Sequence, residues 1–261
     1  MNKTAIQYVT HSWNPITGCS NTFACREYCW ARKMAARMAA NPKVKHRERY
    51  IDFKPAFWPE RLDQPLRMQR PQRIAVNFMG DWACKGVPYE WQEKVLEATL
   101  DTPHTYLFLS KRPDIQASVV KRFLSPCLLP SMVGQCLFGT SISTQAEADE
   151  RIPQLRQCPG RLWLSIEPME GPIDLLKNSD WLQCGRLVSG GMERSGWRHE
   201  IEWVVVGGGP KPMKPDWVRS IRDQCQAAEV PFYLKQLTEN GRRIPFDSVP
   251  LDLQIREFPD A

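Results

Sequence analysis

Three cysteines lie within eleven residues near the start of the chain, at Cys19, Cys25 and Cys29 in the run GCSNTFACREYCW. A structural zinc ion usually takes four protein ligands, which close its coordination shell. Three thiolates can instead hold an iron–sulfur cluster in which one iron has no protein ligand. Because that iron could bind and activate a small molecule, the motif favours a catalytic cluster.

The residue before the last of these cysteines is aromatic, Tyr28. A [4Fe–4S] cluster beside an aromatic side chain is typical of enzymes that use S-adenosylmethionine (SAM) as a radical source. The open iron would chelate the amino and carboxylate groups of SAM, and an electron passed to the sulfonium would release a 5′-deoxyadenosyl radical. Tyr28 would pack against the adenine, while the protein excludes water.

Charged side chains follow several of the apolar runs. Asp81 and Glu167 are candidates for binding the SAM ammonium group or ribose, or for proton transfer. An ion pair with Lys111 or Arg112 is the competing interpretation for each carboxylate. The candidates for the SAM carboxylate or a substrate phosphate are Lys111, Arg112, Lys235 and Gln236. Cys84 lies near a possible active-site loop and is a further catalytic candidate.

Small polar residues and glycines recur at the same end of the expected strands. Asn77, Ser141 and Ser143 could bind the ribose or the methionine part of SAM, although each could equally be an ordinary strand-end hydrogen bonder. Gly207 and Gly208 would let the backbone approach the cofactor closely. Met79 and Ser110 complete the set of candidate cofactor-binding residues.

Apolar runs alternate with helical patterns along most of the chain. The expected strands are Ile74–Met79, Tyr106–Ser110, Leu137–Ile142, Leu162–Ile166, Trp203–Gly207 and Phe232–Lys235, with an earlier strand ending near Trp13. Helical stripes at Trp30/Met34/Met38, Trp91/Val95/Ala98 and Trp217/Ile221/Cys225 are expected to face the core. This alternation predicts an α/β fold with a parallel sheet, as a full or partial TIM-type barrel of six or seven units. We expect a single domain over residues 1–261, with insertions near 39–73 and 184–202.

Positive charge is concentrated in one segment. Arg32 to Arg73 contains twelve Lys or Arg against four Asp or Glu, a local charge of +8, whereas the whole chain carries +6. Tyr50, Phe53 and Trp58 are interleaved with these cations. Basic and aromatic side chains together favour contact with a nucleic acid, and the alternative is a solvated surface without a specific partner.

No secretory leader or apolar membrane span is apparent, so we expect a cytoplasmic protein. In that compartment clustered thiols more often bind metal than form disulfides. The four histidines show no HxH or HExxH pair, and there is no GxSxG or P-loop motif, which disfavours a mononuclear metal hydrolase, a serine hydrolase and a nucleotide-binding P-loop enzyme.

These motifs together resemble a phage-associated radical-SAM-like family, known from prophage-type proteins of unassigned function. The resemblance covers roughly residues 13–237. Its segments here are WNPITGC, RIAVNFMGDWACKGVP, HTYLFLSKRP, LFGTSISTQAEADERIPQL, LWLSIEPMEGPIDL, WVVVGGGPKPMKPDWVRSIRDQC and VPFYLKQL. The cysteine spacing, with five and then three intervening residues, differs from the CxxxCxxC that is usual in radical SAM enzymes.

The resemblance implies a radical-SAM-type partial (βα)6 barrel with a [4Fe–4S] cluster on Cys19, Cys25 and Cys29, SAM as cofactor, and a host reductant such as flavodoxin. Phage enzymes of this type build modified bases, so the expected reaction rearranges or functionalises a modified pyrimidine (thymidine) base in phage DNA. The basic segment fits that use.

Two alternatives remain open. A radical SAM enzyme could act on tRNA, on free nucleotides or on damaged DNA bases. A protein of another class, a zinc-stabilised nucleic-acid-binding protein, would complete its zinc site with His11 or Cys84.

Overall fold

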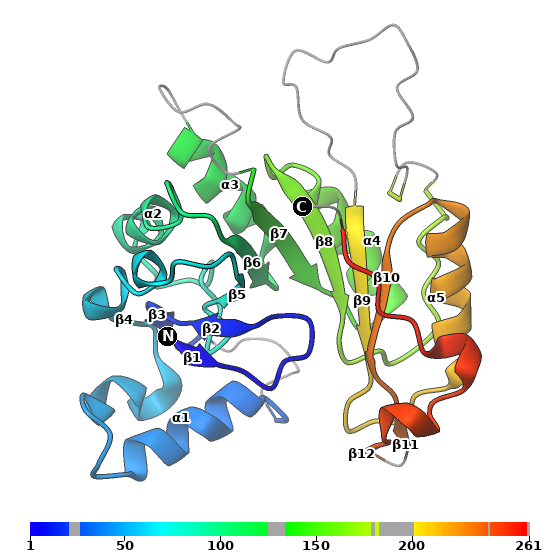
Figure 1. The fold of residues 1–261 in the computed structure, drawn as a ribbon, viewed down its shortest axis with the longest axis horizontal. Helices are drawn as coiled ribbons and strands as arrows, with labels where there is room; N and C mark the ends of the chain where they lie inside the picture. The colour runs from blue at the N-terminus through cyan, green and yellow to red at the C-terminus, as the bar shows by residue number, and fades with distance from the viewer. Residues whose placement is uncertain (21–26, 125–133, 179–180, 183–200, 240, 260–261) are drawn as a thin grey trace, which may run out of the picture.

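The computed structural model describes residues 1–20, 27–124, 134–178, 181–182, 201–239 and 241–259. Strands and helices alternate along the chain (Figure 1). The strands are β1 (Asn2–Lys3), β2 (His11–Trp13), β3 (Ile16–Thr17), β4 (Ala56–Phe57), β5 (Arg73–Val76), β6 (Thr105–Ser110), β7 (Cys136–Ser141), β8 (Arg161–Ile166), β9 (Ile201–Gly207), β10 (Phe232–Gln236), β11 (Thr238–Glu239) and β12 (Arg242–Arg243). The helices are α1 (Trp30–Ala40), α2 (Tyr89–Glu97), α3 (Pro113–Leu124), α4 (Gln145–Leu155) and α5 (Pro215–Ala227).

Eight strands form one sheet in the order β1-β2-β5-β6-β7-β8-β9-β10. Only β1 is antiparallel to its neighbour, and every later pair is parallel. The carboxyl ends of seven strands therefore meet at one edge, which we call the carboxyl edge. The expected α/β class and all six expected strands are confirmed. In the part of the chain that the structure describes, β10 does not pair with β1 or β2, so the sheet is open.

Helices α2, α3, α4 and α5 cover one face of the sheet. Phe108 of β6 and Leu164 of β8 share a continuous apolar core with Ile152 of α4 and Ile221 of α5. Helices α2 and α3 contribute to the same core, and Figure 1 shows these helices around the outside of the sheet. The stripes predicted for α2 and α5 pack against this core as expected.

Aromatic side chains fill the opposite face. Tyr8, which precedes β2, makes edge-on contacts with three rings, with centroids 5.9 Å from Trp163, 5.7 Å from Trp203 and 5.8 Å from Tyr233. Phe258 packs on the same group from the C-terminal segment. Trp163, Trp203 and Tyr233 lie in the first halves of β8, β9 and β10. Polar residues on this face of the sheet, which we call the inner face, therefore lie nearer the carboxyl edge.

The stripe expected on α1 is wrong for Trp30 and Met34, whereas Met38 packs against the neighbouring cluster as expected. Trp30 is 53% exposed and Met34 is 36% exposed, whereas Ala31 and Ala35 are buried. The reason is that α1 packs against the 3-10 segment Arg47–Phe53 and its aromatic side chains, which approach the small alanine face closely.

The segment near 39–73 lies between β3 and β5 as an addition to the repeated units. It contains β4, which pairs with β3, and short 3-10 turns. Most of the segment expected near 184–202 falls outside the described residues. Among the described residues, no helix has the length and apolar character needed to cross a membrane.

Candidate functional site

Two glycines place Cys19 at the carboxyl edge. Gly18 and Gly80 form a parallel bridge just beyond the ends of β2 and β5. A Cβ on Gly80 would lie 2.2 Å from the Gly18 carbonyl oxygen, so the close approach needs glycine. The next residue, Cys19, donates its backbone N–H to the Phe53 carbonyl at 2.9 Å. The segment between β3 and β5 thus holds this cysteine in position.

Cys29 reaches the same small core as Cys19. Both half-buried cysteines pack against a cluster built on Tyr50, Phe53 and Trp58, which is separate from the two sheet cores. Met79, a predicted cofactor-binding residue, also packs there. The first and last cysteines of the motif therefore pack against the same cluster.

A buried ion pair lies beside Cys19. Arg112 Nη1 is 2.8 Å from Asp81 Oδ2 and 3.9 Å from Cys19 Sγ, and Arg112 Nη2 donates to Ser20 Oγ at 2.8 Å. Burial acts to lower the pKa of Arg112, but the negative charges of Asp81 and Cys19 outweigh it and raise that pKa. The guanidinium therefore stays charged next to a sulfur that a metal cluster would need as a thiolate.

The Asp81 carboxylate is saturated by hydrogen bonds. Ser110 Oγ donates to it at 2.7 Å, and the backbone N–H groups of Ala83 and Lys111 donate at 3.1 Å and 3.3 Å. Of the two roles considered for Asp81, the ion pair with Arg112 is the one this geometry favours. Ser110 serves the same network, since its hydroxyl also accepts from the Arg112 N–H at 2.9 Å.

Cys84 lies close to Cys19. A hydrogen bond to Cys19, and then burial, raise the pKa of Cys84, so its thiol stays protonated and can donate to the Cys19 sulfur. His11, the other side chain considered as a fourth metal ligand, starts β2 and lies 3.1 Å from Thr10 Oγ1. Cys84 is thus the better placed of the two.

The middle cysteine of the motif, Cys25, lies outside the described residues. Among the residues that are described, no group of three or more His, Cys, Asp or Glu side chains is arranged to hold a metal ion. The ligand set that the motif predicts stays a prediction.

A second charged group lies at the ends of β8 and β10. Glu167 forms an ion pair with Lys235 and accepts from Tyr8 Oη and Ser165 Oγ, both at 3.4 Å. Burial, and then the charge of Glu167, raise the pKa of Tyr8 well above its ordinary value, so this phenol remains a donor. The partner of Glu167 is therefore Lys235, and neither Lys111 nor Arg112.

Tyr28 links the segment that contains Cys29 to a residue that follows β8. Its hydroxyl donates to Glu170 Oε1 at 3.3 Å, and Lys211 Nζ is 2.6 Å from the other oxygen of that carboxylate. Glu170 follows β8, and Lys211 follows β9. The residue next to Cys29 thus extends toward the carboxyl ends of β8 and β9, where the glycine run begins.

Four of the predicted cofactor-binding residues have structural partners. Asn77 ends β5 with a left-handed φ of 58° and accepts the Ile16 N–H at 2.8 Å. The Ser143 N–H donates to Glu147 at 2.7 Å. A Cβ on Gly207 would lie 3.0 Å from Glu167 Oε2, and one on Gly208 would lie 2.2 Å from Thr238 Oγ1. These glycines therefore make room for side chains of the protein itself.

The remaining two candidates leave their polar side-chain groups available. Ser141 is buried at the end of β7, where its carbonyl accepts from Arg151 at 2.7 Å. Lys111 is half-buried, and its backbone N–H binds Asp81. No side-chain hydrogen bond or ion pair is assigned to either residue in the described part of the chain.

Tyr8 and Ser20 are site residues that the sequence analysis missed. Each stands outside the apolar runs, so periodicity gave no reason to choose it. The sequence does indicate the aromatic face on which Tyr8 packs, because Trp163 and Trp203 occupy paired positions in the neighbouring strands β8 and β9. Two large rings side by side on one face indicate that side chains fill it.

The basic segment keeps much of its charge unpaired. Three of its four acidic residues pair with a Lys or Arg of the same segment, as in Lys54–Asp52 at 3.3 Å and Arg67–Asp63 at 2.5 Å, and Glu48 lies 3.5 Å from the His46 ring. Nine Lys and Arg residues of the segment have no ion pair with a described residue: Arg32, Lys33, Arg37, Lys43, Lys45, Arg47, Arg61, Arg70 and Arg73. The six from Arg32 to Arg47 lie, with exposed Trp30, on α1 and the turn that follows it, and we call this set the basic surface.

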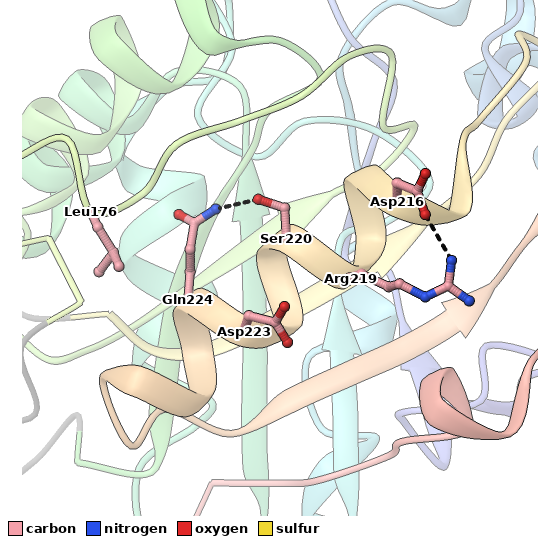
Figure 2. A pocket seen from close by; sticks show the side chains of 6 residues that line it. All are labelled: Leu176, Asp216, Arg219, Ser220, Asp223 and Gln224. Atoms are coloured by element: carbon pink, nitrogen blue, oxygen red, sulfur yellow. Dashed lines mark hydrogen bonds and ion pairs between the residues drawn. The ribbon is translucent and has the colours of Figure 1, made fainter.

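One surface hollow lies away from this edge. It measures about 460 Å³ and lies against α5 (Figure 2). Its charged groups neutralise one another or their neighbours, since Arg219 is 2.8 Å from both Asp216 and Asp252. None of its lining residues is a predicted site residue.

Comparison with known proteins identifies one family. Residues 3–246 match DUF5131, described as a protein of unknown function. No curated protein and no solved structure matches the chain.

Proposed function

The chain belongs to the DUF5131 family, and from its site we propose that it is a radical SAM enzyme built on a partial TIM-type barrel. The single observation that carries the proposal is the position of Cys19 and Cys29. Ten residues apart in sequence, they share one small core at the carboxyl edge of a parallel sheet. In α/β barrels that edge is where chemistry gathers.

The donor set fits an iron–sulfur cluster. Cys19 and Cys29 are half-buried cysteines, and the Arg112 guanidinium supplies positive charge beside Cys19. Cys19, Cys25 and Cys29 would hold the cluster, which when bound supplies the electron that cleaves SAM. Tyr28 and the backbone at Gly207 and Gly208 are the proposed SAM contacts.

The proposed substrate is a pyrimidine base in a nucleic acid. The basic surface on α1 starts directly after Cys29, so a bound strand would pass close to the proposed cluster. We propose that the enzyme rearranges or functionalises a modified thymidine in phage DNA, with a flavodoxin-like reductant of the host cytoplasm. Base–aromatic stacking on exposed Trp30 would hold a nucleotide near the site.

Anaerobic reconstitution tests the proposal. The wild-type protein should take up about four irons per chain and convert SAM to 5′-deoxyadenosine, detected by mass spectrometry. Cys25→Ala and Cys29→Ala should each abolish the visible absorption and SAM cleavage. The control Cys225→Ala changes a buried core thiol of α5 and should retain both. Full cleavage by Cys25→Ala would show that the ligands are wrongly assigned.

The substrate is tested separately. Formation of 5′-deoxyadenosine is measured with duplex DNA containing modified pyrimidines, with tRNA and with mononucleotides, and the nucleosides are profiled afterwards. Stimulation by tRNA or mononucleotides alone would replace the DNA substrate but keep the radical chemistry.

The position of Cys84 favours one second candidate, a zinc-stabilised nucleic-acid-binding protein. Cys84 lies beside Cys19 and could complete a four-thiolate site with the three motif cysteines. A colourless protein with one zinc per chain, purified without oxygen, would favour this candidate over the enzyme.

A further inference from the structure

A smaller pocket beside β10 has a cationic lining. It measures about 300 Å³, and its lining includes Lys235, Arg243 and Arg256 but no Asp or Glu. Ile244 and Phe246 supply apolar surface on the same wall. The size is at the lower end for small-molecule sites, which combine apolar walls with a few placed polar groups.

Arg256 is held in place without a carboxylate. Its Nε donates to the Leu234 carbonyl at 3.4 Å, and its Nη2 donates to Gln7 Oε1 at 3.1 Å. Its guanidinium carbon lies 3.7 Å from the centroid of the Phe246 ring. Stacking and neutral acceptors fix the group but leave its charge uncompensated by any described acidic residue.

Arg243 adds a second uncompensated charge. It lies on β12, and none of the described acidic residues forms an ion pair with it. Lys235 differs, because it pairs with Glu167. The pocket therefore contains two guanidinium groups whose charges a ligand can neutralise.

We propose that this pocket binds the phosphate of a nucleotide unit, either free or within a strand, through Arg243 and Arg256. Guanidinium groups bind phosphate through paired N–H donors, and Gln236, which also lines the pocket, has a second N–H besides the one that its Nε2 donates to the Gly208 carbonyl at 2.8 Å. The apolar wall favours a nucleotide over a bare inorganic anion, because it can bury the sugar or the base. A small carboxylate would leave most of the cavity empty.

The pocket lies next to the proposed reaction site. Lys235 lines the pocket and pairs with Glu167 at the carboxyl edge, so one side chain belongs to both. A nucleotide held here would approach the edge from the side of β10, opposite the basic surface of α1 in the strand order. The inference depends on the pocket residues alone and requires neither cluster nor SAM.

Direct binding to the purified full-length protein, without SAM or reductant, tests the proposal. Thymidine monophosphate and thymidine are titrated calorimetrically, and a labelled single-stranded oligonucleotide is followed by anisotropy. We expect the monophosphate to bind at least tenfold more tightly than the nucleoside. Arg243→Gln should weaken the monophosphate about tenfold, because it removes one charge-assisted contact.

Arg242→Gln is the matched control. Arg242 neighbours Arg243 on the same exposed strand but does not line the pocket, so its loss should change the affinity less than twofold. Equal effects of the two substitutions would show general electrostatic attraction and overturn the site. Equal binding of thymidine and its monophosphate, or equal competition by succinate and inorganic phosphate, would overturn phosphate recognition.

The oligonucleotide separates the two sources of the phosphate. If Arg243→Gln weakens both the oligonucleotide and the monophosphate, the pocket takes a nucleotide unit of a strand. If it weakens only the monophosphate, the pocket takes a free nucleotide. These outcomes are independent of whether 5′-deoxyadenosine is formed.

Discussion

Arg112 reaches Cys19 across 93 residues of sequence, with Nη1 3.9 Å from the cysteine sulfur. The same nitrogen is 2.8 Å from Asp81 Oδ2, so one guanidinium connects a buried carboxylate to a candidate metal ligand. The ion pair is almost inaccessible to water. Its integrity therefore affects both the stability of the fold and the environment of the sulfur.

Replacing Arg112 by glutamine should destabilise the protein and, because Arg112 adjoins a ligand of the proposed cluster, lower the iron taken up on reconstitution. The substitution leaves the Asp81 carboxylate buried without its cation, which typically costs about 3–5 kcal/mol in free energy of unfolding. Urea unfolding measures the cost, and iron per chain measures cluster binding. Arg112→Lys should restore part of both.

The matched control for this change is Arg219→Gln, which removes the exposed ion pairs of α5 and should have little effect. In the double variant Asp81→Asn/Arg112→Gln, the loss in free energy of unfolding should be smaller than the sum of the losses in the two single variants. Each single variant leaves one buried charge without its partner, whereas the double variant removes both charges. Additive losses would show that the two side chains act independently.

Cys84→Ala separates the two metal hypotheses. If three cysteines hold an iron–sulfur cluster, this variant keeps its visible absorption and its iron, because Cys84 only donates a hydrogen bond to Cys19. If four thiolates hold zinc, the same variant loses most of its metal. Metal per chain, measured after anaerobic purification, gives the answer, with Cys29→Ala as the variant that should lose the metal in both cases.

The strands could be predicted from sequence because their physical signal is local. Runs such as Leu162–Ile166 are continuously apolar, since both faces of a parallel sheet are buried. The end of β5 was predicted three residues too late. Asn77 takes a left-handed conformation and accepts the Ile16 N–H, so it ends the strand although the sequence stays apolar through Phe78 and Met79.

The environment of α1 and the contacts of the site could not be predicted in the same way. Periodicity finds the bulky face of α1, but the helix packs its alanine face on Arg47–Phe53, and nothing local to the helix encodes that choice. Asp81 pairs with Arg112 and not with Lys111 because of the directions in which these two side chains point after β6 ends at Ser110. Two adjacent cations give no local signal for it.

Trp30→Ala should weaken binding of single-stranded DNA with little loss of stability. The indole is 53% exposed and follows Cys29, so it can stack on a base, a contact worth about 1–3 kcal/mol. We expect roughly tenfold weaker binding by anisotropy. Leu66→Ala is the control, since Leu66 is 63% exposed in the same basic segment but has no ring. Equal effects of the two variants would exclude stacking.

The protein should lose stability as the pH rises above about 8.5. Burial raises the pKa of Cys136 to about 12 and raises the pKa of Cys158 and Cys225 as well. In the unfolded chain these thiols ionise near their ordinary pKa, while in the fold they stay protonated. The unfolded state then binds fewer protons, so the free energy of unfolding falls by about 1.4 kcal/mol per pH unit for each thiol.

Urea unfolding between about pH 8 and 10 measures this slope. Cys225→Ala removes one of the three thiols and should reduce the slope by one thiol's share, whatever its effect on stability at neutral pH. An unchanged slope would show that Cys225 ionises equally in both states.

Gly208→Ala distinguishes a structural need for glycine from a cofactor contact. An added Cβ would lie 2.2 Å from Thr238 Oγ1 and 2.9 Å from Met213 Sδ, and overpacking of this kind costs about 1–3 kcal/mol. Gly171→Ala is the control, because nothing lies within 4 Å of its added Cβ. We expect Gly208→Ala to lower the urea midpoint and Gly171→Ala to leave it unchanged. If Gly208→Ala is fully stable but binds SAM poorly, the glycine serves the cofactor.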